Sequence, residues 1–480
     1  IDDTSQPFYP DDNKSVKLKR TIGVYDGASI VVGSMIGSGI FIVPTRILEY
    51  CNGDMSLSLI IWVLGGIIAM LMALCYCELA TLLPESGGSA AYLKVVYGDV
   101  LCFIYLWLYL LAANPQSQAV QIIALGDYIS NAVKVSTGTC GPESKVLSKL
   151  IGLLITLVLL VCNITRVKLS VKIQLWCTVG KVAALILIAI LGFVRAVSDS
   201  SVLYTSLQAA PGIAAVSLAV FQSLWAYDGF DNITFITEEV KKPKKTLPMI
   251  IILSFLFVMG LYVVVNLSYF AVLNQKEMIT SSAVAVSFAA KIHPMLTYAV
   301  TLGVCLSLIG SINVNLLTMG RLPFVAARLG FMPKILSMIH IQYFSPLPAL
   351  LFGIILAVAM LVPSNIDILL KAALFMAWAF RSLCALGVLI LRWKMKDAKR
   401  PYKVYSITAL LATLFGFYST LVPLIFRPQA LYVLGVILAA VFYIVYFLMV
   451  RGHINMTGVG KVTVWFQKLF MVASTTEHTS

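Results

Sequence analysis

Charged residues are scarce in this sequence. Asp, Glu, Lys and Arg make up 12% of its 480 residues, whereas an ordinary soluble domain contains about 25%. Hydrophobic residues make up 60%, so polar groups are too few to cover a water-facing surface. Apolar runs of roughly 18–25 residues recur along nearly the whole length, and each can cross about 30 Å of hydrocarbon as a helix. The composition therefore predicts an all-α protein whose solvent is the lipid bilayer.

Motifs for metal binding and catalysis are absent as well. The nine cysteines include no CxxC pair and no Cys/His cluster with metal-ligand spacing. No HExxH, nucleophile elbow or phosphate-binding loop is present, and the four histidines lie outside the predicted spans. The polar stretch up to about Arg20 shows no cleavable signal. We therefore expect no metal ion, no cofactor and no enzymatic activity.

Hydropathy predicts about twelve transmembrane spans. Lys and Arg concentrate in the loops of one side, among them KKPKK after the sixth span, and the other loops carry few. This asymmetry places both termini in the cytoplasm and explains the net charge of +14 without nucleic acid. KKPKK would also suit anionic lipid, although orientation alone explains it. The predicted spans cover residues 24–48, 57–82, 98–132, 148–165, 172–196, 212–238, 248–272, 296–328, 347–362, 368–392, 405–425 and 429–450.

Two spans contain residues that interrupt a helix. The first reads GSMIGSGIF from Gly33, and the sixth reads WAYDGFDNIT from Trp225. Each glycine costs about 1 kcal/mol in a helix interior, so a cluster of glycines makes unwinding cheap. Small residues also line close helix contacts, and either segment alone would favour that interpretation. Two interruptions five spans apart instead indicate an inverted-repeat transporter with its binding site at the bilayer midplane.

This symmetry predicts the organisation of the chain. Two five-helix repeats are related by inversion and are followed by two further helices. The predicted regions are a cytoplasmic N-terminal tail (1–22), the first repeat (23–196), the second, inverted repeat (212–393), helices 11 and 12 (394–450) and a cytoplasmic C-terminal tail (451–480).

Four stretches carry a resemblance to a known family. They read GSMIGSGIFIVPTRIL, CYCELATLLPESGGSAAYL, WAYDGFDNITFITEEVKKPKKTLP and RLGFMPKILSMIHIQYFSPLPA. Together they resemble the L-type amino acid transporter light chains of the amino acid, polyamine and organocation superfamily, in one collinear order from about Lys17 to about Leu448. The resemblance implies the leucine-transporter-like fold, with broken helices 1 and 6, and sodium-independent exchange of amino acids by a heterodimer.

Broken helices suit an amino acid because they offer free backbone groups without fixed charge. N–H groups at the first break can hold the carboxylate, with the Ser38 hydroxyl as a further donor. Freed carbonyls of both breaks can hold the ammonium, as at the matching positions of the family. The predicted substrate-binding residues are Ser34, Met35, Ile36, Gly37, Ser38, Gly39, Asn114, Trp225, Ala226, Asp228 and Gly229.

Asp228 is a carboxylate in the middle of a span, where charge is costly and usually functional. In the resembling family a buried anion at this place is typical of exchangers for cystine and dibasic amino acids, so we expect cationic as well as neutral substrates. The alternative is an internal salt bridge, for which Arg381 is a candidate.

Three further residues take roles from the resemblance. Trp225 matches an aromatic gate, with an interface anchor or a core aromatic as the alternatives. Lys181 places an ammonium where sodium-coupled relatives bind a cation, with snorkelling to the interface as the alternative. Asn114 matches a polar pocket residue, with satisfaction of the carbonyls freed by Pro115 as the alternative.

Cys140 lies in a loop predicted to be extracellular, where a lone thiol suggests an intermolecular bond. The resemblance implies a disulfide to a single-pass type II glycoprotein heavy chain and residence in the plasma membrane. An internal bond to Cys51 is the alternative.

The sequence thus predicts a sodium-independent amino acid exchanger that works by alternating access. One alternative is an exchanger or uniporter of large neutral amino acids in which Asp228 is structural. A channel or a structural membrane subunit is an alternative of another class, but no filter-like motif supports a channel.

Overall fold

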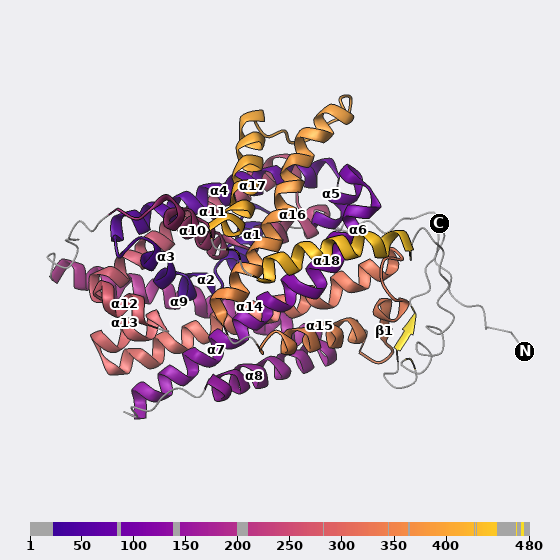
Figure 1. Ribbon diagram of the computed structural model, residues 1–480. Coiled ribbons are helices and arrows are strands. Elements are labelled where there is room, and N and C mark those ends of the chain that lie inside the picture. Colours follow the sequence, from indigo (N-terminus) through magenta and orange to yellow (C-terminus); the bar gives the residue numbers. More distant parts are fainter. Residues whose placement is uncertain are drawn as a thin grey trace, which may run out of the picture.

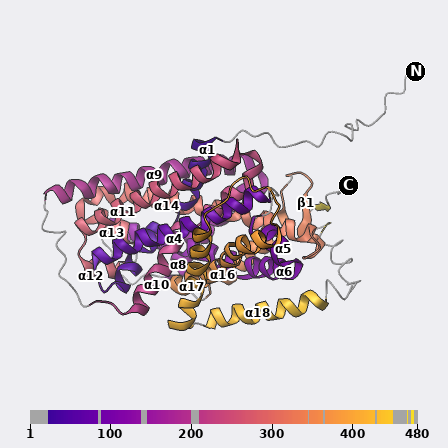
Figure 2. The same ribbon diagram turned by 90° about the horizontal axis from the view of Figure 1, so that it is seen from above.

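The computed structural model describes residues 23–83, 88–137, 145–198, 210–281, 283–343, 345–362, 365–426, 428, 430–448, 467 and 472–474. Nearly all of these residues are helical, and the long helices pack side by side in one bundle (Figure 1). Seen from above, α9 (Val167–Ser198) runs along one edge and α18 (Ala430–Tyr446) along the opposite edge (Figure 2). The predicted all-α membrane fold is confirmed.

Every predicted span corresponds to helix in the part of the chain that the structure describes. Eight helical stretches are long and apolar enough to cross a membrane, and a bent pair at 27–50 passes the same test. Three further apolar stretches are shorter: Ile213–Tyr227, Leu347–Ala359 and Tyr432–Tyr446. The long stretches consist of α4 (Met55–Leu82), α6 (Asp99–Leu108) with η1 (Tyr109–Ala113) and α7 (Asn114–Thr137), α8 (Lys145–Thr165), α9, α11 (Pro243–Val272), α14 (Pro294–Arg328), α16 (Ile366–Lys394) and α17 (Ser406–Phe426).

The third span changes its helical form where Pro115 lies. Five residues, Tyr109–Ala113, form a π-helical turn, and the Asn114 N–H donates to the Tyr109 carbonyl. Proline has no N–H, and its ring clashes with the carbonyl four residues earlier in an α-helix. The wider turn removes that clash and lets the span continue as α7.

Short elements cap the bundle. The stretch GSAAYLKVVY forms the ten-residue helix α5 (Gly88–Tyr97), which packs against α6 and α16. β1 (Met338–His340) pairs antiparallel with β2 (Val472–Ser474). The remaining short elements are α12 (Gln275–Thr280), α13 (Val284–Ile292), η5 (Lys334–Ser337) and α15 (Leu347–Ala359).

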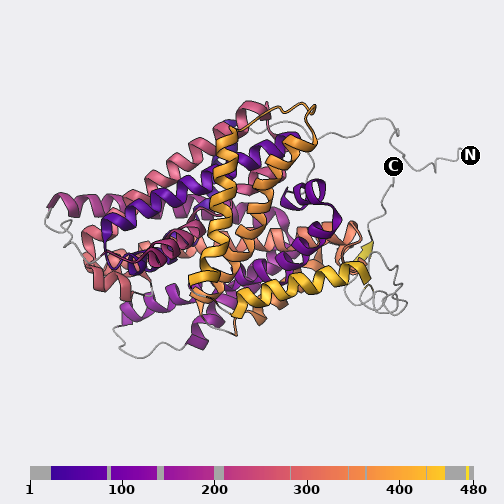
Figure 3. The same cartoon turned by 45° about the horizontal axis from the view of Figure 1, so that its top comes forward.

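Helices α16 and α17 lie side by side (Figure 3), and a buried carboxylate of α4 joins them. Glu78 is 1% exposed. Its oxygens accept from Arg392 Nε at 3.1 Å and from Arg392 Nη2 at 2.5 Å. Glu78 Oε2 also accepts from the Val404 N–H at 2.9 Å, and Arg400 Nη1 lies 3.8 Å from Glu78 Oε1. One side chain therefore holds α4 to the end of α16 and to the connection that leads to α17.

Replacing Glu78 with Gln should destabilise the protein strongly. Removing one partner of a buried pair leaves an uncompensated charge and costs about 3–5 kcal/mol. Glu49→Gln is the control, because the Arg46–Glu49 pair is about half exposed and such surface pairs contribute about 0–1 kcal/mol. Thermal unfolding of the purified variants in detergent measures the difference. Equal melting temperatures for the two variants would contradict the role given to Glu78.

Candidate functional site

The first span is interrupted at the predicted glycines. Helix α1 (Val24–Met35) ends before Ile36, and α2 (Gly39–Ile42) begins after Ser38. Among the described residues, the N–H groups of Gly37 and Ser38 donate no hydrogen bond. Ser38 is buried. The break therefore presents free backbone donors inside the protein, as a carboxylate site requires.

The direction of the first span changes at a different point from the glycines. Residues 27–42 and 44–50 meet at an angle of 57°. The bend lies at Val43, immediately before Pro44, which is the first residue of α3 (Pro44–Tyr50). Val43 keeps helical backbone angles, but Pro44 has no N–H, and its ring would clash with the Ile40 carbonyl in a straight helix, so the chain bends. Pro44 was the local signal for this bend. The glycines interrupt hydrogen bonding, and the proline redirects the chain.

The sixth span is interrupted twice. Helix α10 (Ile213–Ser223) passes into a 3₁₀ turn, η3 (Leu224–Tyr227), and a second 3₁₀ segment, η4 (Phe230–Glu239), follows Gly229. The φ angle of Gly229 is +93°, a conformation that a side chain would strain. Asp228 therefore lies at a sharp corner of the chain between two half-spans.

The two breaks touch each other. A Cβ atom on Gly39 would lie 2.4 Å from Ala226 Cα, and one on Gly229 would lie 3.0 Å from the Ser34 carbonyl oxygen. The Trp225 Nε1–H donates to Ser38 Oγ at 3.2 Å, so the indole reaches the first break. The absence of side chains at these two glycines permits the close approach.

Tyr262 of α11 ties the breaks together, and the sequence reasoning missed it. Its hydroxyl lies 3.0 Å from the Met35 carbonyl oxygen and 2.9 Å from the Ala226 carbonyl oxygen. These are two of the carbonyls predicted to hold the substrate ammonium, and they share the single O–H proton of Tyr262. Among the described residues, the carbonyls of Ser34 and Ile36 accept no hydrogen bond.

Asp228 is paired, so the internal salt bridge considered as an alternative is present. Arg381 Nη2 contacts Asp228 Oδ1 and lies 3.3 Å from Asp231 Oδ2. The guanidinium also lies over the Phe230 ring, 5.0 Å from its centroid. The Asp228 carboxylate is therefore not free in this structure. Two carboxylates share one guanidinium, however, so the formal charge of Arg381, Asp228 and Asp231 together is −1. The Asp228 side chain is also 32% exposed.

Lys181 points into the protein, which excludes snorkelling to the interface. It is 1% exposed, and its ammonium donates to the Gly33 carbonyl in the last turns of α1. From α14, Ser307 Oγ donates to the Gly37 carbonyl at 3.0 Å. A covalent cation therefore lies directly beside the first break.

The structure places Asn114 but does not describe Cys140. Asn114 is buried at the start of α7, and neither its Nδ2 nor its Oδ1 meets a hydrogen-bond partner among the described residues. Its side chain thus does not satisfy carbonyls freed by Pro115, and that alternative is wrong. Cys140 lies outside the described residues, and Cys51 is a buried free thiol.

A second buried charge cluster, which the sequence reasoning also missed, joins the two broken spans. Lys371 of α16 is 2% exposed, contacts Asp367 and donates to the Tyr50 hydroxyl at 2.9 Å. Gln222 Nε2 donates to Asp367 Oδ1 at 2.8 Å. Because Tyr50 ends α3 and Gln222 lies in α10, α16 holds the half-spans that flank both breaks.

Two broken spans that meet inside an all-α bundle define a membrane transporter with a central binding site. The amino acid permease family matches residues 22–447 of this chain. The chain therefore belongs to this family, and it is a transporter and not an enzyme.

Individual relatives agree with this family. The chain is 34% identical over 440 residues to the b(0,+)-type amino acid transporter 1 of Homo sapiens, covering 91% of this chain and 89% of the relative. It is 35% identical over 406 residues to the large neutral amino acids transporter small subunit 2 of Mus musculus, covering 83% and 75%. It is 34% identical over 419 residues to the cystine/glutamate transporter of Pongo abelii, covering 85% and 83%. The resemblance to the light chains is confirmed.

Gly39→Ala should reduce amino acid uptake at least about tenfold, a loss of about 1.4 kcal/mol in binding or transport. The added methyl group would lie 2.4 Å from Ala226 Cα and push the two breaks apart. Gly260→Ala in α11 is the matched control, because nothing lies within 4 Å of the added atom. Uptake normalised to surface expression is the measurement. Normal uptake by Gly39→Ala would show that contact between the breaks is not required.

Proposed function

We propose that this chain is a sodium-independent amino acid exchanger that carries neutral and cationic amino acids by alternating access. The main observation in support of this proposal is the contact between the two helix breaks around Ser38 and Trp225. All three relatives are named as transporters of amino acids, and one name specifies cystine and glutamate.

The amino acid backbone would bind at the first break. The N–H groups of Gly37 and Ser38 are free donors for the carboxylate, and the Ser34 and Ile36 carbonyls are free acceptors for the ammonium. The Ser38 hydroxyl, which now accepts from Trp225, can instead donate to the carboxylate once the indole moves. The carboxylate and the ammonium of the substrate then both have hydrogen-bond partners in a region where lipid supplies none.

The second break would select the side chain. Asp228 and Asp231 share Arg381, so a lysine or arginine side chain would neutralise the remaining negative charge. A neutral side chain needs no such partner and can be carried as well. If the cluster is only structural, the chain is instead an exchanger or uniporter of large neutral amino acids.

Trp225 would be the gate. It is buried and hydrogen-bonded across the first break, so a substrate can leave past it only when the indole moves. The first, second, sixth and seventh spans would rock together against the remaining spans. In support of this grouping, α11 packs against α1 and α4, and Tyr262 of α11 joins both breaks.

Lys181 would replace the sodium ion of coupled transporters. Its ammonium already donates a hydrogen bond to the Gly33 carbonyl, so a bound cation is not needed to stabilise this conformation of α1. Uptake should therefore be unchanged when choline replaces sodium.

A heavy chain would complete the transporter. The name of one relative, a small subunit, supports assembly with another chain, and Cys140 would form the disulfide to a single-pass type II glycoprotein. The heterodimer would reside in the plasma membrane with both termini of this chain in the cytoplasm, as the basic loops suggest.

Exchange and substrate charge can be tested together in proteoliposomes. Preloaded leucine should accelerate uptake of external leucine, because an exchanger returns faster when loaded, and a channel would show no acceleration. Asp228→Asn should lower arginine uptake at least about tenfold, or about 1.4 kcal/mol, while leucine uptake persists. Asp99→Asn is the control, since its pairing with Lys94 is half exposed.

The outcomes separate the two claims. Trans-stimulation with equal loss of arginine and leucine uptake in Asp228→Asn would keep exchange and reject the charge role. Absence of trans-stimulation in the unmodified protein would reject exchange itself.

Cys140→Ser should remove the high-mass band of the heterodimer on non-reducing electrophoresis of cells that express this chain with a heavy chain. Cys51→Ser is the matched control and should leave the band intact, because Cys51 is buried. A band that persists in Cys140→Ser would reject this disulfide.

A further inference from the structure

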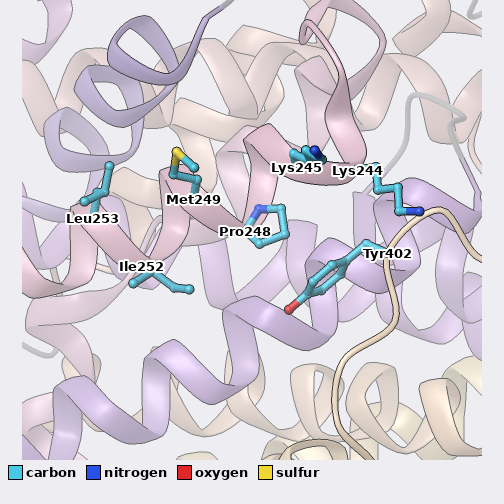
Figure 4. A pocket seen from close by; sticks show the side chains of 7 residues that line it. All are labelled: Lys244, Lys245, Pro248, Met249, Ile252, Leu253 and Tyr402. Carbon is cyan, nitrogen blue, oxygen red and sulfur yellow. The ribbon is translucent and has the colours of Figure 1, made fainter.

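A groove of about 420 Å³ lies at the beginning of α11, where the sequence reads KKTLPMIIIL (Figure 4). Helix α11 supplies most of its lining, and Tyr402 of the connection between α16 and α17 forms the opposite wall. None of its lining residues belongs to the helix breaks or the charge clusters described above. The groove is therefore a separate feature of the protein.

One end of the groove is cationic. Lys244 and Lys245 line it and are exposed, and neither takes part in an ion pair among the described residues. Tyr402 is half-buried, and its hydroxyl points away from the two ammonium groups, toward the apolar part of the lining (Figure 4). This end can bind an anion through two ammonium groups.

The other end of the groove is apolar. Pro248, Met249, Ile252 and Leu253 continue the lining along α11, away from the lysines (Figure 4). Met249, Ile252 and Leu253 are all exposed, as expected of side chains that face hydrocarbon. At a rise of about 1.5 Å per residue, the eight steps along the helix from Lys245 to Leu253 span roughly 12 Å. This length leads from a headgroup layer into the acyl region.

We propose that this groove binds an anionic glycerophospholipid of the cytoplasmic leaflet. Lys244 and Lys245 hold the phosphate, and an acyl chain lies along Pro248, Ile252 and Leu253, facing Tyr402. The charge and the apolar surface occur in the order that a phospholipid presents them. A zwitterionic lipid offers the same chains but adds a cation beside the two lysines, so the site discriminates by charge.

The bound lipid would touch two parts of the protein that are anchored separately. Helix α11 carries Tyr262, whose hydroxyl joins the two breaks. Tyr402 lies two residues before Val404, whose N–H is held by buried Glu78. A lipid between α11 and Tyr402 therefore adds contacts that only the folded protein offers, and it should raise the thermal stability.

The test compares two double variants with the same change in charge. K244Q/K245Q alters the groove, and K241Q/K242Q alters exposed lysines of the same loop that do not line it. The full-length protein, purified with its partner chain if it has one, is titrated with phosphatidylglycerol in mixed micelles. Binding is followed by native mass spectrometry and by thermal unfolding, with phosphatidylcholine titrated in parallel.

We expect phosphatidylglycerol to raise the melting temperature of the unmodified protein and phosphatidylcholine to have little effect. Each lysine near a lipid surface contributes roughly a fivefold change in affinity, so K244Q/K245Q should bind phosphatidylglycerol about 10–30-fold more weakly. K241Q/K242Q should bind within about twofold of the unmodified protein. Y402F should also bind within about twofold of the unmodified protein, because the hydroxyl points away from the two ammonium groups and the ring that faces the acyl chain is kept (Figure 4).

Three results would overturn the proposal. Equal weakening by both double variants would show a diffuse attraction to the basic loop. Equal binding of phosphatidylcholine would show that the lysines do not recognise charge. Displacement of the lipid by the same concentration of inorganic phosphate would show an anion site without a role for the apolar lining. None of these measurements depends on transport activity. A negative result would therefore reject the lipid site without counting against the proposed exchange.

Discussion

The whole site depends on one constraint: backbone groups that leave a helix inside a membrane must find partners within the protein. The Tyr262 hydroxyl offers its single proton to the Met35 and Ala226 carbonyls, one from each break. Ser307 satisfies the Gly37 carbonyl. The groups left without partners, among them the Gly37 and Ser38 N–H groups, lie where a substrate could complete them. The protein thus holds both breaks in place and leaves these groups free.

Buried charge follows the same rule. Lys181 is compensated by a carbonyl, Glu78 by two arginines, and Lys371 by Asp367. A charge in a region of low dielectric needs a partner close by. Lys181 and Glu78 find that partner on elements far apart in the sequence, whereas Asp367 lies four residues from Lys371 in α16. The Arg381 cluster differs, since its two carboxylates outnumber its one guanidinium. That imbalance makes it the place where substrate charge can matter.

Local patterns predicted a large part of this architecture and of the site. Apolar runs predicted helix at each proposed span within the described residues, and the clustered glycines of GSMIGSGIF placed the first break between Met35 and Gly39. The 57° bend at Pro44 was missed, although proline carries its own local signal. Tyr262 could not be selected, because a tyrosine in an apolar helix looks the same whether it anchors at an interface or bonds to a carbonyl. Glu78 lay in a recognised motif without an evident partner, since Arg392 is 314 residues away.

The sequence by itself determined the solvent, the class of fold and the positions of the breaks, because hydropathy and glycine content act over a few neighbouring residues. Only the tertiary structure decided which groups meet. It paired Asp228 with Arg381 and directed Lys181 to Gly33. Those contacts join residues about 150 positions apart along the chain, and no local pattern encodes the packing of one helix against another.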